Sequence, residues 1–299
     1  MQPSDEAQTD PGLDGIVEWR SLAAEALRRL SEAGVGDPHL ESRWLVEEAA
    51  GFDPGDLHAR QRELVTVRGI TRFDTMIERR LEGVPIQYVL GHWQFRTLDL
   101  MVDHRVLIPR PETEVLAGVA IDLLADHTGP NVVDLGTGSG AIGLSVAFEH
   151  PTANVWLTDH DSEAVRVARA NLAGLGRPGS RVVIVEGDWF GALPGELVGA
   201  VDAIVSNPPY IATDDQLDPS VADHEPSNAL IAGDAGTEDL LSIVFGAPRW
   251  LVRGGYLMLE MDPSQVESIA AAAIERGFDS IEVVKDLAGK DRIIVAVAP

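Results

Sequence analysis

The sequence predicts an α/β protein in which a doubly wound, mostly parallel sheet follows a small bundle of helices. Strand and helix patterns alternate from Glu112 onward, which is typical of parallel sheets built from βαβ units. A glycine-rich turn follows the first of these strands and opens the next helix. The last two strands are neighbours joined by the short loop 286–291, so we expect them to form an antiparallel hairpin.

The N-terminal residues contain helix patterns only. Residues 1–14 are polar and acidic and do not resemble a secretory signal, so we expect a disordered tail. Residues 15–84 predict a bundle of about four short helices. Asp37-Pro38 and Asp53-Pro54 each combine a capping residue with a proline suited to the first helical turn, and they predict the starts of the second and third helices. The fourth helix is expected at residues 71–81.

Residues 85–111 predict a β-hairpin connector, with short strands at 88–90, 93–95 and 98–106. Residues 112–299 predict the sheet domain. Its helices are expected at 114–126, 141–149, 162–175 and 264–276, and its strands at 131–135, 154–158, 181–186, 200–206, 255–261, 280–285 and 292–298.

Composition and charge argue against several classes of function. The net charge is −25, and no cluster of Lys and Arg is available to bind a phosphate backbone, which argues against nucleic acid as the substrate. No apolar run is long enough to span a membrane. The chain has no cysteine, and its histidines lack the spacing of metal ligands, so we expect no metal site. We expect a cytoplasmic, monomeric protein.

The glycine-rich turn is the first candidate site. Gly136 and Gly138 allow the backbone to turn sharply and to approach a ligand closely, and the lysine of a phosphate-binding loop is absent. Asp159 ends the next strand, 19 residues after Gly140, where a carboxylate can accept both ribose hydroxyls. The alternative role for Asp159 is a helix N-cap, for which Asp161 competes. A dehydrogenase would show the same two features.

The end of the third strand is the next candidate. The Asp188 carboxylate can accept a hydrogen from the amino group of an adenine, and Trp189 can flank the ring. The alternatives are an acidic loop residue and an aromatic residue of the core.

Asn207-Pro208-Pro209-Tyr210, at the end of the fourth strand, separates these possibilities. The prolines fix φ and remove two backbone donors, so that local carbonyl groups can face a ligand. The Asn207 side-chain carbonyl and the Pro208 backbone carbonyl can each accept one N–H of an –NH2 group, and Tyr210 offers an aromatic face to a planar group. Two such acceptors turn the nitrogen lone pair toward an electrophilic methyl group, without a strong base.

These sites, in a sheet that ends in an antiparallel hairpin, resemble the class I fold of S-adenosylmethionine (AdoMet)-dependent methyltransferases, a Rossmann-like sheet of seven strands. The Asn-Pro-Pro-Tyr tetrapeptide is similar to that of amino-methyltransferases. More of the chain resembles the HemK/PrmC family, the peptide chain release factor glutamine methyltransferases. The matching stretches are Leu107-Ile108-Pro109-Arg110-Pro111-Glu112-Thr113-Glu114, residues 85–88 with Gly91, residues 134–140 and 206–211, residues 225–226 with 229–230, and residues 285–289 with 291–292.

The resemblance implies methyl transfer from AdoMet, with S-adenosylhomocysteine as product, to the glutamine of a Gly-Gly-Gln motif in a release factor. It implies that AdoMet is held by Gly136, Thr137, Gly138, Ser139, Gly140, Asp159 and Trp189, and touched by Asn207. It implies that the substrate glutamine is held by Asn207, Pro208, Pro209 and Tyr210, and that the N-terminal bundle contacts the release factor elsewhere.

Other functions remain open at this point. An N6-adenine nucleic-acid methyltransferase has the tetrapeptide in its favour and the −25 charge against it. A glutamine methyltransferase of a ribosomal protein differs in the stretch from Leu107 to Glu114. A binding module with a relic AdoMet pocket has no reason to keep both acceptors and the aromatic ring. A dehydrogenase gives no role to residues 207–210.

Overall fold

The computed structural model describes residues 17–299, which form two compact units, one ending at Leu90 and one spanning Gly91–Pro299. Each unit is described by itself. The tail expected at residues 1–14, and the first residues of the expected bundle, lie outside the described residues.

The first unit is helical. Its helices are α1 (Trp19–Glu32), α2 (Pro38–Ala50), α3 (Leu57–Arg60), α4 (Val67–Leu81) and α5 (Ile86–Leu90). Leu30, Leu45, Phe73 and Ile77 are fully buried between them. Asp37 caps α2 as expected, because its side chain accepts the Leu40 N–H at 3.0 Å.

Three expectations for this region are wrong. Asp53-Pro54 does not open a helix, because the Glu47 carboxylate accepts the N–H groups of Gly55 and Leu57 at 2.9 and 3.3 Å and holds a turn there. Helix α4 begins at Val67, before residue 71, because Thr66 caps it through the Gly69 N–H.

The third error is the strand expected at residues 88–90, which form helix α5. The Pro85 carbonyl accepts the N–H groups of Tyr88 and Val89 at 3.0 and 3.1 Å, so the chain begins a helical turn there. Ile86 and Val89 pack into the helical core, a periodicity that a short strand would not produce.

The second unit begins with the antiparallel hairpin of β1 (His92–Phe95) and β2 (Leu98–Met101). Strand β2 ends before residue 106, because Asp103 accepts the N–H of Arg105 and holds a turn. A seven-stranded sheet follows, in the order β5-β4-β3-β6-β7-β9-β8. Its strands are β3 (Asn131–Leu135), β4 (Asn154–Asp159), β5 (Val182–Glu186), β6 (Val201–Ser206), β7 (Leu251–Glu260), β8 (Ser280–Lys285) and β9 (Asp291–Val297).

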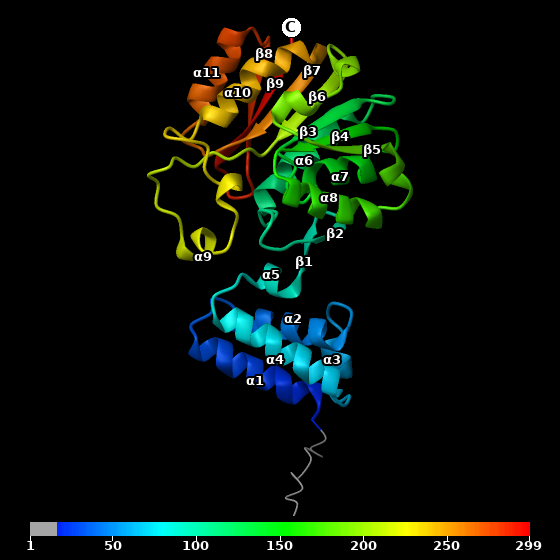
Figure 1. Ribbon diagram of the computed structural model, residues 1–299, viewed down its shortest axis with the longest axis vertical. Coiled ribbons are helices and arrows are strands. Elements are labelled where there is room, and N and C mark those ends of the chain that lie inside the picture. Colours follow the sequence, from blue (N-terminus) through cyan, green and yellow to red (C-terminus); the bar gives the residue numbers. More distant parts are fainter. Residues whose placement is uncertain (1–16) are drawn as a thin grey trace, which may run out of the picture. The chain divides into compact units, whose positions relative to one another are not determined.

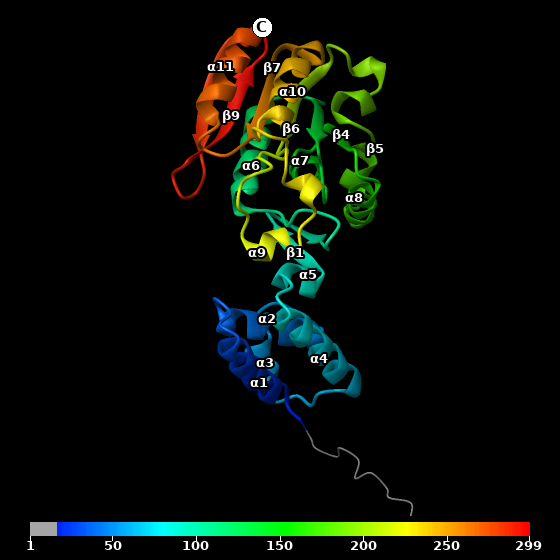
Figure 2. The ribbon, with the colours of Figure 1, turned by 60° about the vertical axis from the view of Figure 1, so that its left-hand side comes forward.

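The sheet is parallel from β5 to β7, whereas β9 runs antiparallel to both β7 and β8. The α/β prediction and the C-terminal antiparallel hairpin are therefore confirmed. Figures 1 and 2 show the sheet of the second unit between its helices. The helices of this unit are α6 (Pro111–Leu124), α7 (Ala141–Glu149), α8 (Ser162–Gly174), α9 (Pro219–Ala222), α10 (Glu238–Gly246) and α11 (Val266–Arg276), of which α9 lies away from the sheet.

Each face of the sheet has its own core. One core joins the sheet to α6, α7 and α8, and the other joins it to α10 and α11. Val132 belongs to the first core and Val133 to the second, because successive side chains of a strand point to opposite faces. Strands buried on both faces are continuous apolar runs, which is why their positions could be predicted from the sequence.

The sheet also creates a binding crevice. Strand β3 lies between β4 and β6, so the chain leaves β3 toward one edge of the sheet and returns on its other side at β6. Ligands of such sheets bind beyond the carboxyl ends of the strands at this reversal. The Ser206 hydroxyl donates to the Leu135 carbonyl at 2.6 Å and ties the ends of the two strands together.

Candidate active site

The glycine-rich turn after β3 adopts a backbone that favours glycine. Gly136, Gly138 and Gly140 have φ values of +67°, +55° and +88°, a region that side chains with a Cβ rarely enter. A Cβ on Gly136 would also lie 3.2 Å from the ring of Trp189. The Thr137 N–H donates to the Thr158 carbonyl at 2.9 Å, which joins the turn to β4.

Asp134, the last but one residue of β3, holds this turn against α7. Its Oδ2 accepts the Thr137 hydroxyl at 2.6 Å and the Gly143 N–H at 2.9 Å, and its Oδ1 is buried with no partner among the described residues. Burial raises the pKa of Asp134 to about 7, although these two hydrogen bonds oppose the shift; the charge of Asp159 adds to it.

Asp159 ends β4 and reaches back to the turn. Its two carboxylate oxygens accept the N–H groups of Gly138 and Asp161, each at 2.9 Å. Burial raises its pKa, and the two backbone hydrogen bonds oppose that shift. The N-cap of α8 is Asp161, which accepts the Glu163 N–H at 2.8 Å, so Asp159 is not the cap. Each carboxylate oxygen has a further lone pair, so Asp159 can still accept hydroxyl groups.

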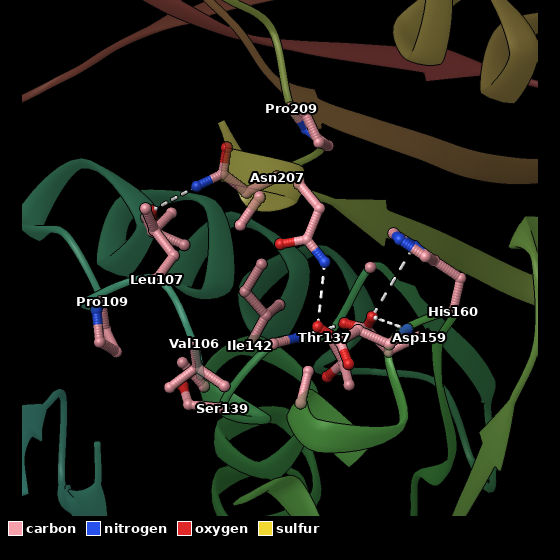
Figure 3. Close-up of a pocket in the computed structure, with 18 of the residues that line it drawn as sticks. Val106, Leu107, Pro109, Thr137, Ser139, Ile142, Asp159, His160, Asn207 and Pro209 are labelled. Atoms are coloured by element: carbon pink, nitrogen blue, oxygen red, sulfur yellow. Dashed lines mark hydrogen bonds and ion pairs between the residues drawn. The ribbon is translucent and has the colours of Figure 1, made fainter. Parts of the chain in front are cut away.

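A pocket of about 220 Å³ opens beside the turn (Figure 3). It gathers most of the residues predicted to bind a cofactor, from the ends of four neighbouring strands. They are Gly136, Thr137, Gly138, Ser139, Asp159, Asp188, Trp189 and Asn207. Gly140 does not line the pocket; it is the N-cap of α7, and a Cβ there would lie 2.7 Å from the Leu144 side chain.

Trp189 has both of the roles considered for it. Its ring packs against the core beneath α10 and α11, and it also lines the pocket beside Asp188. Trp189 has a φ of +39°, which is unusual outside glycine. Asp239 lines the same pocket, and burial and then the charge of Asp188 raise its pKa. The sequence does not single out Asp239, because no helix is predicted at residues 238–246.

Asn207 lies between this pocket and a second one of about 210 Å³, which Pro208 and Tyr210 line. The Asn207 Nδ2 donates to the Thr113 hydroxyl at 3.1 Å. Its Oδ1 is buried and meets no hydrogen-bond partner within residues 17–299. Pro209 lines the first pocket instead (Figure 3). Asn207 thus lines both pockets and carries a buried acceptor oxygen without a partner in the described part of the chain.

Tyr210 is held by its backbone. Gln265 donates from Nε2 to the carbonyls of Tyr210 and Gly236 at 2.8 and 2.9 Å. Burial, and then the charge of Glu260, raises the pKa of the Tyr210 phenol to about 12, so it remains protonated at neutral pH. Tyr210 therefore offers an aromatic surface and not a base.

The stretch from Leu107 to Glu114 forms one wall of the first pocket. Glu225 fixes it, because its carboxylate accepts the Ile108 N–H at 3.1 Å and pairs with Arg110. Leu107, Pro109, Arg110 and Thr113 line the pocket. The sequence assigns no individual role to Thr113. Thr113 and Asn207 are 94 positions apart in the sequence, so no local pattern predicts their contact.

Known proteins resemble both units. Residues 21–91 match the PrmC N-terminal domain, and residues 115–224 match the Methyltransferase small domain. A release factor glutamine methyltransferase from Agrobacterium fabrum is 36% identical over 289 residues, which is 95% of this chain and 98% of that protein. One from Xylella fastidiosa is 41% identical over 76% of this chain and 81% of its own.

The catalytic domain of hMettl16, solved in complex with MAT2A 3'UTR hairpin 6, shares the fold. It covers 77% of this chain and 81% of its own length, with a TM-score of 0.52 and 15% identity. The mixed sheet, the glycine-rich turn at its reversal and these matches define a class I methyltransferase, a fold and family that use AdoMet. The chain belongs to the release factor glutamine methyltransferase family.

Proposed function

We propose that this enzyme transfers a methyl group from AdoMet to the side-chain amide nitrogen, N5, of the glutamine in the Gly-Gly-Gln motif of peptide chain release factors. The observation that carries this proposal is Asn207, which lines both pockets and whose buried side-chain oxygen has no partner among residues 17–299. A buried acceptor without a partner is costly, and a substrate N–H would satisfy it. Membership of the glutamine methyltransferase family supports the same target.

The first pocket fits AdoMet. Gly136 and Gly138 leave room for close approach to the turn, and the Asp159 carboxylate lines the same pocket with lone pairs still free to accept hydroxyl groups. Asp159 would accept the ribose hydroxyls, and Asp188 and Trp189 would hold the adenine. Thr137, Ser139 and Gly140 complete the turn. Bound AdoMet supplies an electrophilic methyl group on a sulfonium sulfur.

The second pocket would hold the substrate glutamine. Its –NH2 group would donate one N–H to Asn207 Oδ1 and the other to the Pro208 carbonyl, with the planar amide against Tyr210. Pro209 would support the bend of this loop. Both acceptors favour the pyramidal, partly positive nitrogen of the transition state. The nitrogen would take the methyl group from the sulfonium sulfur, and one amide proton would then leave to solvent, so the two acceptors suffice and no strong base is required.

The remaining expectations belong to the same proposal. The N-terminal bundle would contact the release factor away from its glutamine, and residues 85–111 would connect that bundle to the methyltransferase domain. The enzyme would act as a cytoplasmic monomer and would not methylate nucleic acid. Across residues 17–299, no helix is long and apolar enough to cross a membrane.

Transfer of labelled methyl from AdoMet to a purified release factor tests the proposal. A release factor with the motif glutamine replaced by alanine, and duplex DNA alone, are the two controls. We expect label on the unmodified release factor only. Label on DNA would indicate an N6-adenine nucleic-acid methyltransferase. Label on the alanine-substituted release factor would mean that the methylated residue lies elsewhere in that protein.

A further inference from the structure

One side chain of helix α8 joins the β1–β2 hairpin to the glycine-rich turn. Asn171 Oδ1 accepts the Met101 N–H at 2.7 Å, and Asn171 Nδ2 donates to the Met101 carbonyl at 3.1 Å. The same Nδ2 donates to the Ser139 carbonyl at 2.8 Å. A side-chain amide nitrogen has two hydrogens, so both are used, and a half-turn of the amide would place its oxygen against two carbonyl oxygens. The orientation of Asn171 is therefore fixed.

On the hairpin side, Asn171 binds the free edge of β2. The N–H of Val102 donates to the Gly91 carbonyl at 3.1 Å, across the hairpin. Successive residues of an antiparallel pair turn their backbone groups to opposite sides, so those of Met101 point away from β1. The Asn171 amide thus binds the N–H and the carbonyl of Met101 as a neighbouring strand would.

The other end of the same hairpin is anchored independently. Arg96 lies at the turn between β1 and β2 with φ of +50°, and its guanidinium binds the Glu149 carboxylate at 2.8 and 2.7 Å. Arg96 also donates from its side chain to the Glu114 carbonyl and from its backbone to the Glu114 carboxylate, each at 3.1 Å. The hairpin is therefore held at both ends, and Asn171 is bound to a fixed strand.

On the cofactor side, Asn171 holds the peptide group between Ser139 and Gly140. The carbonyl oxygen of this peptide accepts from Asn171, and its N–H donates to the Thr137 carbonyl at 2.8 Å. Because a peptide group is planar, hydrogen bonds at both of its ends fix the plane. Ser139 lines the first pocket, whereas Asn171 does not. Asn171 can therefore affect the cofactor only through the turn.

We propose that Asn171 is a positioning residue for the cofactor, because it holds the Ser139–Gly140 peptide against β2 and so keeps the glycine-rich turn in the conformation that binds AdoMet. Asn171 touches neither the cofactor nor the methyl acceptor. This role goes beyond the proposed function, since it concerns the cofactor pocket alone and is the same for any methyl acceptor. The coupling is reciprocal, so a cofactor bound at the turn should also hold β2 at Met101.

Asn171→Ala removes the link without adding a charge. We expect the Kd for S-adenosylhomocysteine, measured by calorimetry on the full chain, to rise about tenfold, as expected for the loss of one or two hydrogen bonds that position the turn. A Kd equal to that of the wild type would mean that the turn keeps its conformation without Asn171, and would overturn the proposal.

Asn131→Ala is the matched control. The Asn131 Nδ2 donates to the Ala200 carbonyl at 2.8 Å, at the amino end of β3 and so at the end of that strand opposite the turn. We expect both alanine variants to unfold at lower urea concentration than the wild type, and Asn131→Ala to leave the Kd nearly unchanged. Equal increases of the Kd would assign the weaker binding to lost stability and overturn the role of Asn171.

Hydrogen exchange of the Met101 amide tests the reciprocal effect in the unmodified protein. We expect S-adenosylhomocysteine to slow this exchange, since the Met101 N–H is bound to Asn171. The Gly129 amide, which donates to the Thr152 hydroxyl at 3.0 Å before the amino end of β3, should exchange at the same rate with and without the cofactor. A Met101 exchange rate that the cofactor leaves unchanged would overturn the coupling.

Asn171→Asp separates the two sides of the link. A carboxylate keeps an acceptor for the Met101 N–H but cannot donate to the Ser139 carbonyl, so S-adenosylhomocysteine should no longer slow Met101 exchange in this variant. Slowing equal to that of the wild type would show that the effect does not pass through Asn171. None of these measurements contains a release factor, so an error in the proposed substrate would not change their results.

Discussion

The Asn207 side chain uses both ends of its amide. The nitrogen donates to Thr113 at 3.1 Å, and the oxygen is a buried acceptor without a partner among the described residues, on a residue that lines both pockets. Preorganised groups of this kind stabilise a transition state because they need no reorientation during the reaction. The contribution of Asn207 should therefore appear in the chemical step more than in cofactor binding.

Asn207→Ala removes this acceptor, and we expect the single-turnover rate of methyl transfer to fall by about 10² or more, with a smaller loss of AdoMet affinity. Asn228→Ala is a matched control. Asn228 lines the same pocket, but its amide is bound to Asp161 at 2.9 Å, so the rate should fall much less. Equal rates for Asn207→Ala and the wild type would remove Asn207 from the mechanism.

Site residues at the ends of strands can be predicted from the sequence, whereas site residues that come from helices cannot. Asp159, Asp188 and Asn207 follow apolar runs, so their side chains fall at the same edge of the sheet. Thr113 and Asp239 reach the site from helices whose faces depend on packing. Asp239 lies 50 positions after Trp189 in the sequence, and no local pattern connects the two.

At the scale of elements, burial explains which predictions hold. Strands β3 and β8 and helix α7 have the expected bounds, because each is a short apolar or alternating run between turn residues. Helix α10 is not predicted, because its apolar residues form one short, nearly continuous run at 240–245, in which helical and strand periodicities are hard to distinguish. Helix α5 is too short for its periodicity to separate it from a strand.

The segment after Asn207 is held by backbone contacts to a distant turn. Ile211 exchanges hydrogen bonds with Leu230 and Ala232, both at 3.0 Å, and Gln265 links Tyr210 to Gly236. Gly236 has a φ of +71°, and a Cβ there would lie 2.8 Å from the Tyr210 carbonyl oxygen. No side chain fits at Gly236 unless the Tyr210 backbone moves.

Gly236→Ala should therefore displace the substrate loop. We expect kcat/KM for the release factor to fall about tenfold or more, with AdoMet affinity nearly unchanged. Gly199→Ala has the same backbone strain, with φ of +68°, but its Cβ would meet no atom of the described chain within 4 Å. If both variants lose activity equally, strain and not displacement of Tyr210 is responsible.

At the scale of the whole molecule, the alternation of strands and helices predicts a parallel sheet but not the order of its strands. The order places β3 between β4 and β6, and only this arrangement brings the turn at Gly136 beside Asn207. The crevice thus depends on contacts between segments far apart in the sequence. The same strand order buries the carboxyl groups of Asp134 and Glu260 at the carboxyl ends of β3 and β7.

These buried carboxyl groups oppose folding at neutral pH. Burial raises the pKa of Asp134 from 3.8, and of Glu260 from 4.5, to about 7 in the folded protein. Between these values the folded state binds protons that the unfolded state has released, so the free energy of unfolding decreases as the pH rises toward 7. Each group contributes a slope of at most about 1.4 kcal/mol per pH unit. The net charge of −25 adds self-repulsion in the same direction.

The substitution Asp134→Asn distinguishes the effect of a buried carboxyl group on stability from the effect of net charge. It keeps an oxygen for the hydrogen bonds from Thr137 and Gly143 but removes the titrating group. We therefore expect the free energy of unfolding to decrease less steeply with pH, and the variant to be more stable than the wild type above pH 7. Asp126→Asn, at an exposed position, removes the same charge without relieving a buried carboxylate. Urea unfolding of the cofactor-free proteins across this range measures the slopes. Equal slopes in the two variants would assign the pH dependence to net charge, because both substitutions remove one negative charge and only Asp134 is buried.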